Sequence, residues 1–240
     1  MKYLFIDDHN VEQIENLARI LHQPRKHGAV LRPEHRWENN GTTLNNAPIW
    51  DSEKQVYKLV YGCASEPVDW TADDLFMRGA TGPRRIHSYF CYAESADGVI
   101  WEKPTLDLYE YEAMAWNGKR IGGANNIIPG GKPAVLDPHD PDPNRRYKAQ
   151  RHADSTHMQT EKFAVSPDLF NWEWLDTPGV PGGGTSSFTY DEQRQLFIIT
   201  VKRRGPYGRA VYLTTSEDFV TWGEPEFIFS ADHQDQENGF

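Results

Sequence analysis

The chain has 240 residues, a formal net charge of −10 at pH 7 and an aromatic content of 12%. Its length allows one large domain or two small ones. The acidic balance disfavours nucleic acid and anionic membranes, so we expect neither as a partner. No apolar run reaches the roughly 18 residues that a membrane-spanning helix needs. The start, MKYLFIDDHN, turns acidic too early for a signal peptide. The sequence as it stands therefore predicts a cytoplasmic chain, or one without its targeting segment.

The first part of the chain, residues 1–41, is predicted to be an N-terminal segment outside the repeated structure described next. Asp8 follows a short apolar run, as if leaving a strand, although a turn or helix cap explains it equally well. The stretch Val11–Leu21 is the one candidate helix, and it fits a strand as well. Trp37 and Glu38 stand immediately before the first repeated unit.

A motif of the form Ser-x-Asp-x-x-x-Trp occurs three times, beginning at Ser95, Ser166 and Ser216. Each copy follows a strand-like run of apolar residues. The repetition indicates a structural corner rather than a nucleophile with its helper. We expect Asp97 to hold the turn through backbone N–H groups, and Gly98 to supply a conformation that other residues resist.

Hairpin patterns precede these corners. The segments 49–61 and 189–201 align almost residue for residue as strand, polar turn and return strand, and 134–150 repeats the pattern with a longer, proline-rich loop. Asp51, Asp191 and Asp137 occupy the same place in the three hairpins. Because aspartate accepts hydrogen bonds from turn N–H groups, we predict a turn role for all three.

Four strands in about 50 residues are typical of a β-propeller blade. The prediction is therefore an all-β chain, residues 1–240, forming a single β-propeller domain. Three four-stranded blades are predicted over residues 42–104, 125–175 and 185–225, and residues 226–240 would begin a further blade.

Several motifs resemble the five-bladed propellers of glycoside hydrolase families 32 and 43, and most of all an uncharacterised bacterial branch of them. These are the corner itself, AVLRPEHRWE from Ala29, NNIIPG from Asn125 and RRYKA from Arg145. The resemblance implies a sugar-binding funnel on the central axis, with paired carboxylates that cleave a glycosidic bond. It implies an oligosaccharide or glycoside as the partner, and we expect neither a cofactor nor a metal site.

The blade starts carry amides and hydroxyls where the resemblance implies acids. Asn46 and Asn126 are predicted to hold sugar hydroxyls, and Trp37 to stack on a sugar ring. The candidate catalytic acids are then Glu38, Asp8, Asp235 and Glu237. The alternative is a non-catalytic carbohydrate-binding or assembly propeller, or an inactive fragment of a longer enzyme.

Two further points concern the ring and the cysteines. Three blades cannot close a five-bladed ring, so partner copies forming a homo-oligomer are one way to cover the open edge. Cys63 and Cys91 are predicted to be buried thiols on neighbouring strands, and a single disulfide between them stays open.

Overall fold

The computed structural model contains an all-β arrangement of three antiparallel sheets. It describes residues 11–44, 46–65, 88–109, 124–153, 160–182 and 186–237. Within these ranges no helix is both long enough and apolar enough to span a membrane.

Blade 1 is the first sheet. Its strands are β1 (Thr42–Thr43), β2 (Ile49–Asp51), β3 (Val56–Ala64), β4 (Ser88–Ser95) and β5 (Ile127–Ile128). Both β1 and β2 pair with the same edge of β3, one after the other, so together they form one interrupted inner strand. The outer strand β5 pairs with β4, so residues 127–128 belong to blade 1, although the sequence predicted that blade 2 begins at residue 125. A short 3-10 helix, η1 (Arg36–Glu38), precedes the sheet.

Blade 2 repeats this order. It consists of β6 (Ala134–Leu136), β7 (Tyr147–Ala153), β8 (Thr160–Ser166), β9 (Glu173–Trp174) and β10 (Val180–Pro181), with the 3-10 helix η2 (Pro143–Arg145) in its first hairpin. Here β9 and β10 both pair with β8 and form the interrupted outer strand.

Blade 3 has four strands in the order β11-β12-β13-β14. They are β11 (Ser187–Asp191), β12 (Leu196–Gly205), β13 (Gly208–Ser216) and β14 (Glu226–Ser230), and the helix α2 (His233–Glu237) follows. Residues 226–230 therefore complete blade 3, beyond the boundary at residue 225 that we predicted.

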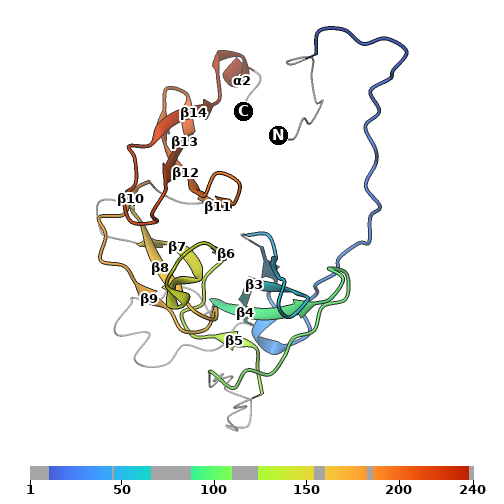
Figure 1. The fold of residues 1–240 in the computed structure, drawn as a ribbon, viewed down its shortest axis with the longest axis vertical. Helices are drawn as coiled ribbons and strands as arrows, with labels where there is room; N and C mark the ends of the chain where they lie inside the picture. The colour runs from blue at the N-terminus through green and yellow to red at the C-terminus, as the bar shows by residue number, and fades with distance from the viewer. Residues whose placement is uncertain are drawn as a thin grey trace.

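The three sheets follow one another along an arc, with β11, β6 and β3 on its inner side (Figure 1). The blue segment from residue 11 to about 30 runs apart from the sheets and has neither helix nor strand. Val11–Leu21, for which the sequence left helix and strand open, is thus irregular. Ile14, Leu17, Ile20 and Leu21 are exposed, so the segment lacks the burial that stabilises either element.

The corners have the predicted hydrogen bonds. The Ser95 hydroxyl oxygen accepts from the Gly98 N–H at 2.9 Å. The Asp97 carboxylate accepts from the N–H groups of Val99 and Ile100 at 2.8 Å each. Asp168 and Asp218 accept the corresponding two bonds in blades 2 and 3. The structural reading of the motif is therefore confirmed.

The fourth position of the corner has a positive φ in all three blades. Gly98 has a φ of 74°, as predicted, and Leu169 and Phe219 adopt the same region with φ values of 76° and 62°. A side chain in this region costs roughly 1–2 kcal/mol. Leu169 and Phe219 are fully buried, and burying such a side chain gains about 1.5–3 kcal/mol. Core packing thus offsets the local strain.

The hairpin aspartates also behave as predicted. Asp51 and Asp191 each accept N–H groups from the residues two and three positions further on. Asp137 accepts the N–H of His139 at 3.0 Å. Its place in the repeat therefore identified its role.

Apolar clusters fill the space between blades. One joins blade 1 to blade 2 around Tyr92 and Tyr147, and another joins blade 2 to blade 3 around Phe163 and Phe197. A third covers the other face of blade 1, where Trp37 packs on the sheet. Cys63 and Cys91 lie in this third cluster as buried free thiols, with sulfur atoms 3.1 Å apart. Their predicted burial on neighbouring strands is confirmed.

Candidate functional site

An axial hollow of about 420 Å³ lies where the inner strands β2, β6 and β11 of the three blades converge. Its walls include the aromatic side chains Trp50 and Tyr190 and the polar side chains Asn46, Thr189 and Glu192. The side chains of each inner strand point alternately to its two sides. Together the three strands therefore line the hollow with aromatic rings next to polar side chains.

The hollow is anchored across the blades. The Asn46 side-chain amide donates to the Ala134 carbonyl at 3.2 Å, which ties blade 1 to blade 2. Trp50 stays 38% exposed, and its ring lies tilted against Tyr57 at 4.7 Å between centroids. An indole face held in this way is suited to stacking on a flat apolar surface such as a sugar ring.

Tyr190 and Glu192 supply the ionisable groups of the hollow. Burial, and then the neighbouring Asp137 carboxylate, raise the pKa of Tyr190 to about 12, so its hydroxyl keeps its proton at neutral pH. Glu192 is the single carboxylate among the described lining residues, and it lies 4.0 Å from the His139 imidazole. Paired-carboxylate cleavage needs two acids, so this lining favours hydrogen bonding and stacking.

Of the residues predicted from the sequence, Asn46 lines the hollow, whereas Trp37, Asn126 and Glu38 gather in a buried network on blade 1. The Trp37 indole N–H donates to the Asn126 side-chain oxygen at 3.0 Å. The Asn126 amide donates to the Tyr61 hydroxyl at 2.8 Å, and that hydroxyl donates to Glu38. Trp37 and Asn126 therefore hydrogen-bond to the protein in this structure.

Glu38 is fully buried, and its carboxylate forms an ion pair of 2.8 Å with Lys103. Burial by itself raises the pKa of Glu38, but the hydrogen bonds from Lys103, Tyr61 and the Glu34 N–H prevail and lower it. A general acid must hold a proton at the working pH, and a lowered pKa opposes this. The geometry is that of a carboxylate stabilised in its ionised form.

Asp235 and Glu237 lie on the short helix α2 and not on the hollow. The Asp235 carboxylate accepts the Asp232 N–H at 3.0 Å, and Asp232 accepts the Asp235 N–H in return, as in a helix cap. Glu237 lies 3.3 Å from the His233 imidazole. Asp8 is outside the residues that the structure describes.

Sequence reasoning missed Trp50 and Tyr190. A signal was present, because each directly precedes the hairpin aspartate of its blade, Asp51 or Asp191. Neighbouring residues of a strand point to opposite sides. The residue before the hairpin aspartate therefore points away from the side that the aspartate faces, and in blades 1 and 3 it lines the hollow. The repeat locates this position in every blade.

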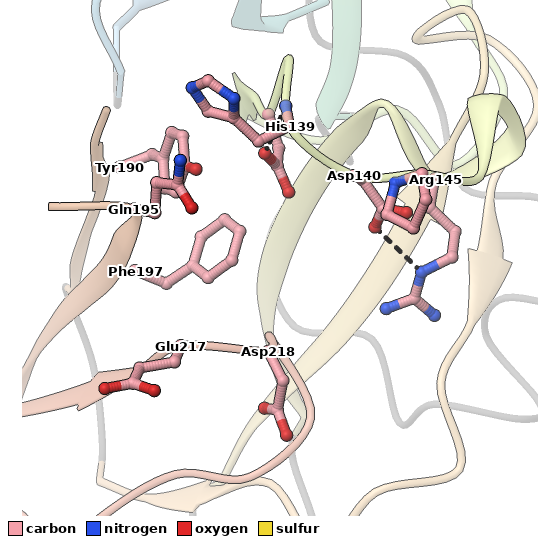
Figure 2. A pocket seen from close by; sticks show the side chains of 10 residues that line it. His139, Asp140, Arg145, Tyr190, Gln195, Phe197, Glu217 and Asp218 are labelled. Atoms are coloured by element: carbon pink, nitrogen blue, oxygen red, sulfur yellow. Dashed lines mark hydrogen bonds and ion pairs between the residues drawn. The ribbon is translucent and has the colours of Figure 1, made fainter. Parts of the chain in front are cut away.

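A second cavity, of about 330 Å³, lies between the first hairpin of blade 2 and the corner of blade 3 (Figure 2). Figure 2 shows the carboxylates of Glu217 and Asp218 on one side and Asp140 paired with Arg145 on another. Burial raises the pKa of Asp218, but its backbone hydrogen bonds lower it to about 2. These groups mainly hold turns, and no set of three metal-ligating side chains occurs in the described part of the chain.

The repeated four- and five-stranded sheets around an axial hollow define propeller blades. Comparison with solved structures supports this class. The chain matches a β-fructofuranosidase from Schwanniomyces occidentalis, solved with fructosyl-erythritol, with a TM-score of 0.50 and 14% identity. The match covers 84% of this chain and 36% of that one. Over most of its length the chain thus has the same fold as part of a five-bladed propeller structure, as the sequence predicted.

Two further matches have TM-scores below 0.5. A β-1,2-mannobiose phosphorylase from Listeria innocua aligns with a TM-score of 0.47 and 12% identity, over 85% of this chain and 63% of that one. An N-acetylgalactosamine deacetylase from F. plautii aligns with a TM-score of 0.43 and 16% identity, over 77% and 53%. The chain thus spans between 36% and 63% of these structures. No protein-family profile and no curated protein sequence matches it.

Proposed function

We propose that the protein is carbohydrate-active and binds a neutral sugar in the axial hollow. The observation that carries the proposal is the pairing of an exposed, fixed indole face, Trp50, with hydrogen-bonding side chains from two blades, Asn46 and Thr189. A sugar offers both an apolar ring face and hydroxyls that donate and accept, so it complements both kinds of group.

Cleavage of a glycosidic bond is the second candidate function. The propeller fold favours it, because the match to a β-fructofuranosidase covers 84% of this chain. Glu38, Asp8, Asp235 and Glu237 remain the candidate acids in this proposal. Binding without cleavage is the simpler reading of the lining, where Glu192 is the single carboxylate among the described residues.

Binding is tested by isothermal titration calorimetry of the protein with sucrose and with β-1,2-mannobiose. We expect saturable heats of binding, and Trp50→Ala should weaken binding at least about tenfold, equivalent to roughly 1.4 kcal/mol. Trp174→Ala is the matched control, because Trp174 is 45% exposed but lies on the outer strand β9. Equal loss of binding in both variants, or none in either, would contradict the site.

Cleavage is tested separately by following reducing-sugar release from the same two disaccharides. If the chain hydrolyses either, Glu38→Gln and Asp235→Asn identify whether the candidate acids act. A hydrolysis rate that both variants leave unchanged would remove these residues from the proposal. Saturable binding with no release of reducing sugar supports the binding function alone.

A further inference from the structure

Three lysine residues are buried in the described part of the chain, and Lys132 differs from the other two. Lys58 lies 2.7 Å from the Asp51 carboxylate, and Lys148 lies 3.3 Å from the Asp137 carboxylate. Lys132 is only 2% exposed, yet its ammonium group forms no ion pair with the carboxylate of any described residue. A buried charge is costly unless it is paired, so Lys132 lacks the counter-charge that the other two lysines have.

Two indole rings and one carbonyl group surround the Lys132 ammonium instead. Its nitrogen lies 5.4 Å from the centre of the Trp172 ring and 4.6 Å from the centre of the Trp174 ring. Its one hydrogen bond to a described residue is to the Gly130 carbonyl oxygen. The rings attract a cation, but they cancel none of its charge. An ammonium group has three N–H donors, so two of them are left for another acceptor.

Arg151 on β7 adds a second positive charge. Burial, and then Arg151, lower the pKa of Lys132 to about 8, and no carboxylate of a described residue opposes this shift. Arg151 pairs in register with Lys162, and Trp174 pairs with Ala164, two residues further along β8. Alternate residues of a strand point to the same side, so Arg151, Lys162 and Trp174 share one face of blade 2. Positive charge therefore collects on this face.

The two cations of the paired strands differ in their hydrogen bonds. The Lys162 ammonium donates to the carbonyl oxygens of Thr177 and Pro178 at 2.8 and 3.3 Å. Arg151 is exposed, and its guanidinium forms neither a hydrogen bond nor an ion pair with another described residue. Lys132 and Arg151 are therefore the two cations of this face that retain donors for a ligand.

Gly130 leaves a space beside the Lys132 ammonium. Gly130 is exposed and has a φ of 63°. A side-chain carbon at this glycine would lie 4.0 Å from the Lys132 nitrogen, and apart from its chain neighbours it would meet no other described atom within 4 Å. Ion pairs in proteins have nitrogen–oxygen distances of up to about 4 Å. The space is therefore close enough for an anion to pair with the ammonium.

We propose that Lys132 and Arg151 bind the anionic group of a ligand, a carboxylate or a sulfate or phosphate group, in the space beside Gly130. The anion supplies the counter-charge that aspartates supply to Lys58 and Lys148. It also accepts the N–H groups that Lys132 and Arg151 leave unused, and such charged hydrogen bonds are among the strong ones. Neither residue lines the axial hollow, so this proposal is independent of sugar binding there.

Isothermal titration calorimetry at constant ionic strength tests the site with three probes: inorganic sulfate, inorganic phosphate and glucuronate. We expect saturable binding of at least one probe, and Lys132→Met and Arg151→Met should each weaken it at least about tenfold. Arg204→Met is the control, because Arg204 is an exposed arginine on β12 of blade 3 and should leave binding unchanged. Circular dichroism confirms that each variant is folded.

The three probes also distinguish the two sources of the anionic group. Glucuronate that binds more tightly than both inorganic ions supports a charged sugar as the ligand. Sulfate or phosphate that binds at least as tightly as glucuronate supports a free anion. If none of the three probes binds saturably, or if Lys132→Met leaves their binding unchanged, the proposal is overturned.

A carboxylate introduced at Gly130 tests the same site from within the chain. Aspartate and asparagine adopt a positive φ more readily than most residues, so Gly130→Asp and Gly130→Asn form a matched pair that differs in charge. Without added anions, Gly130→Asp should unfold at a temperature about 2–4 °C higher than Gly130→Asn, because its carboxylate reaches Lys132. Gly130→Asp should also lose the binding of the three probes. Equal unfolding temperatures, or probe binding that Gly130→Asp retains in full, would contradict the site.

Discussion

The interface between blades 1 and 2 and the interface between blades 2 and 3, the two joints, each bury a lysine, but different groups surround the two lysines. In both, a buried lysine pairs with the hairpin aspartate of its own blade beneath an aromatic ring of the next. At the first joint the ring is Tyr147, whose hydroxyl accepts a hydrogen bond from Lys58. At the second joint the ring is Phe197, which has no polar atom.

The longer hairpin of blade 2 makes up for the missing hydroxyl. It brings Asp140 and the Arg145 carbonyl oxygen to the Lys148 ammonium, in addition to Asp137. A buried charge is costly unless it is both paired and hydrogen-bonded. In each joint the aromatic residue and the hairpin together complete the hydrogen bonds and ion pairs of the lysine.

The largest effect is expected from breaking the second joint. Lys148→Met leaves the buried Asp137 carboxylate without its cation and leaves Asp140 with Arg145 alone, so the free energy of unfolding should fall by about 3–5 kcal/mol. Urea denaturation measures it. Arg194→Met is the control at the exposed hairpin of blade 3, where Arg194 lies 3.3 Å from Asp191, and it should change stability by less than about 1 kcal/mol. Similar values for both variants would contradict the importance of the joint.

Acid should weaken the first joint through Asp51. Burial raises the pKa of Asp51, but the bonds from Lys58 and the turn N–H groups lower it to about 2. The unfolded carboxyl binds its proton at higher pH, so the stabilisation is complete above about pH 4 and is lost as the pH falls to about 2. Its size is about 2 kcal/mol.

Asp51→Asn isolates this contribution. The difference in unfolding free energy between wild type and variant should shrink by about 2 kcal/mol between pH 5 and pH 2. Denaturant titrations at a series of pH values measure it. If the difference in unfolding free energy stays constant across this range, the pKa of Asp51 is not lowered by folding.

The smallest effect is expected from making the first joint resemble the second. Tyr147→Phe removes the hydroxyl that Lys58 uses, without the extra carboxylate that accompanies Phe197, and should lower the unfolding free energy by about 1 kcal/mol. Tyr207→Phe, at a 39% exposed tyrosine, should stay within about 0.5 kcal/mol of wild type. A Tyr147→Phe variant as stable as wild type would mean that the ring alone suffices.

The corners and hairpins could be predicted because their interactions are local. Asp97 and Asp51 bond to N–H groups two or three residues away, so the pattern of residues contains the whole interaction. Repetition of the pattern then identified the blades. The corner position of Leu169 escaped prediction, because the burial that compensates its backbone conformation comes from another blade.

The candidate site was only partly predictable. Its position at a blade start predicts Asn46 near the funnel, and it lines the axial hollow. The sequence also predicts Glu38 and Asn126 as site residues, but Glu38 and its partner Lys103 are 65 residues apart, as are Asn126 and its partner Tyr61. No local pattern of residues indicates that such distant partners lie together and form the hydrogen bonds of Glu38 and Asn126.

The sequence by itself determined the repeated unit, because each blade is built from short-range turns and from strands paired with their neighbours in the chain. Only the tertiary structure decided which polar residues were buried and which remained open. Lys58 and Tyr147 are 89 residues apart, and their contact depends on how two blades pack. The packing of the blades sets the distance between residues and their access to solvent. It therefore buries the charge of Lys58 and leaves Trp50 and Phe229 exposed.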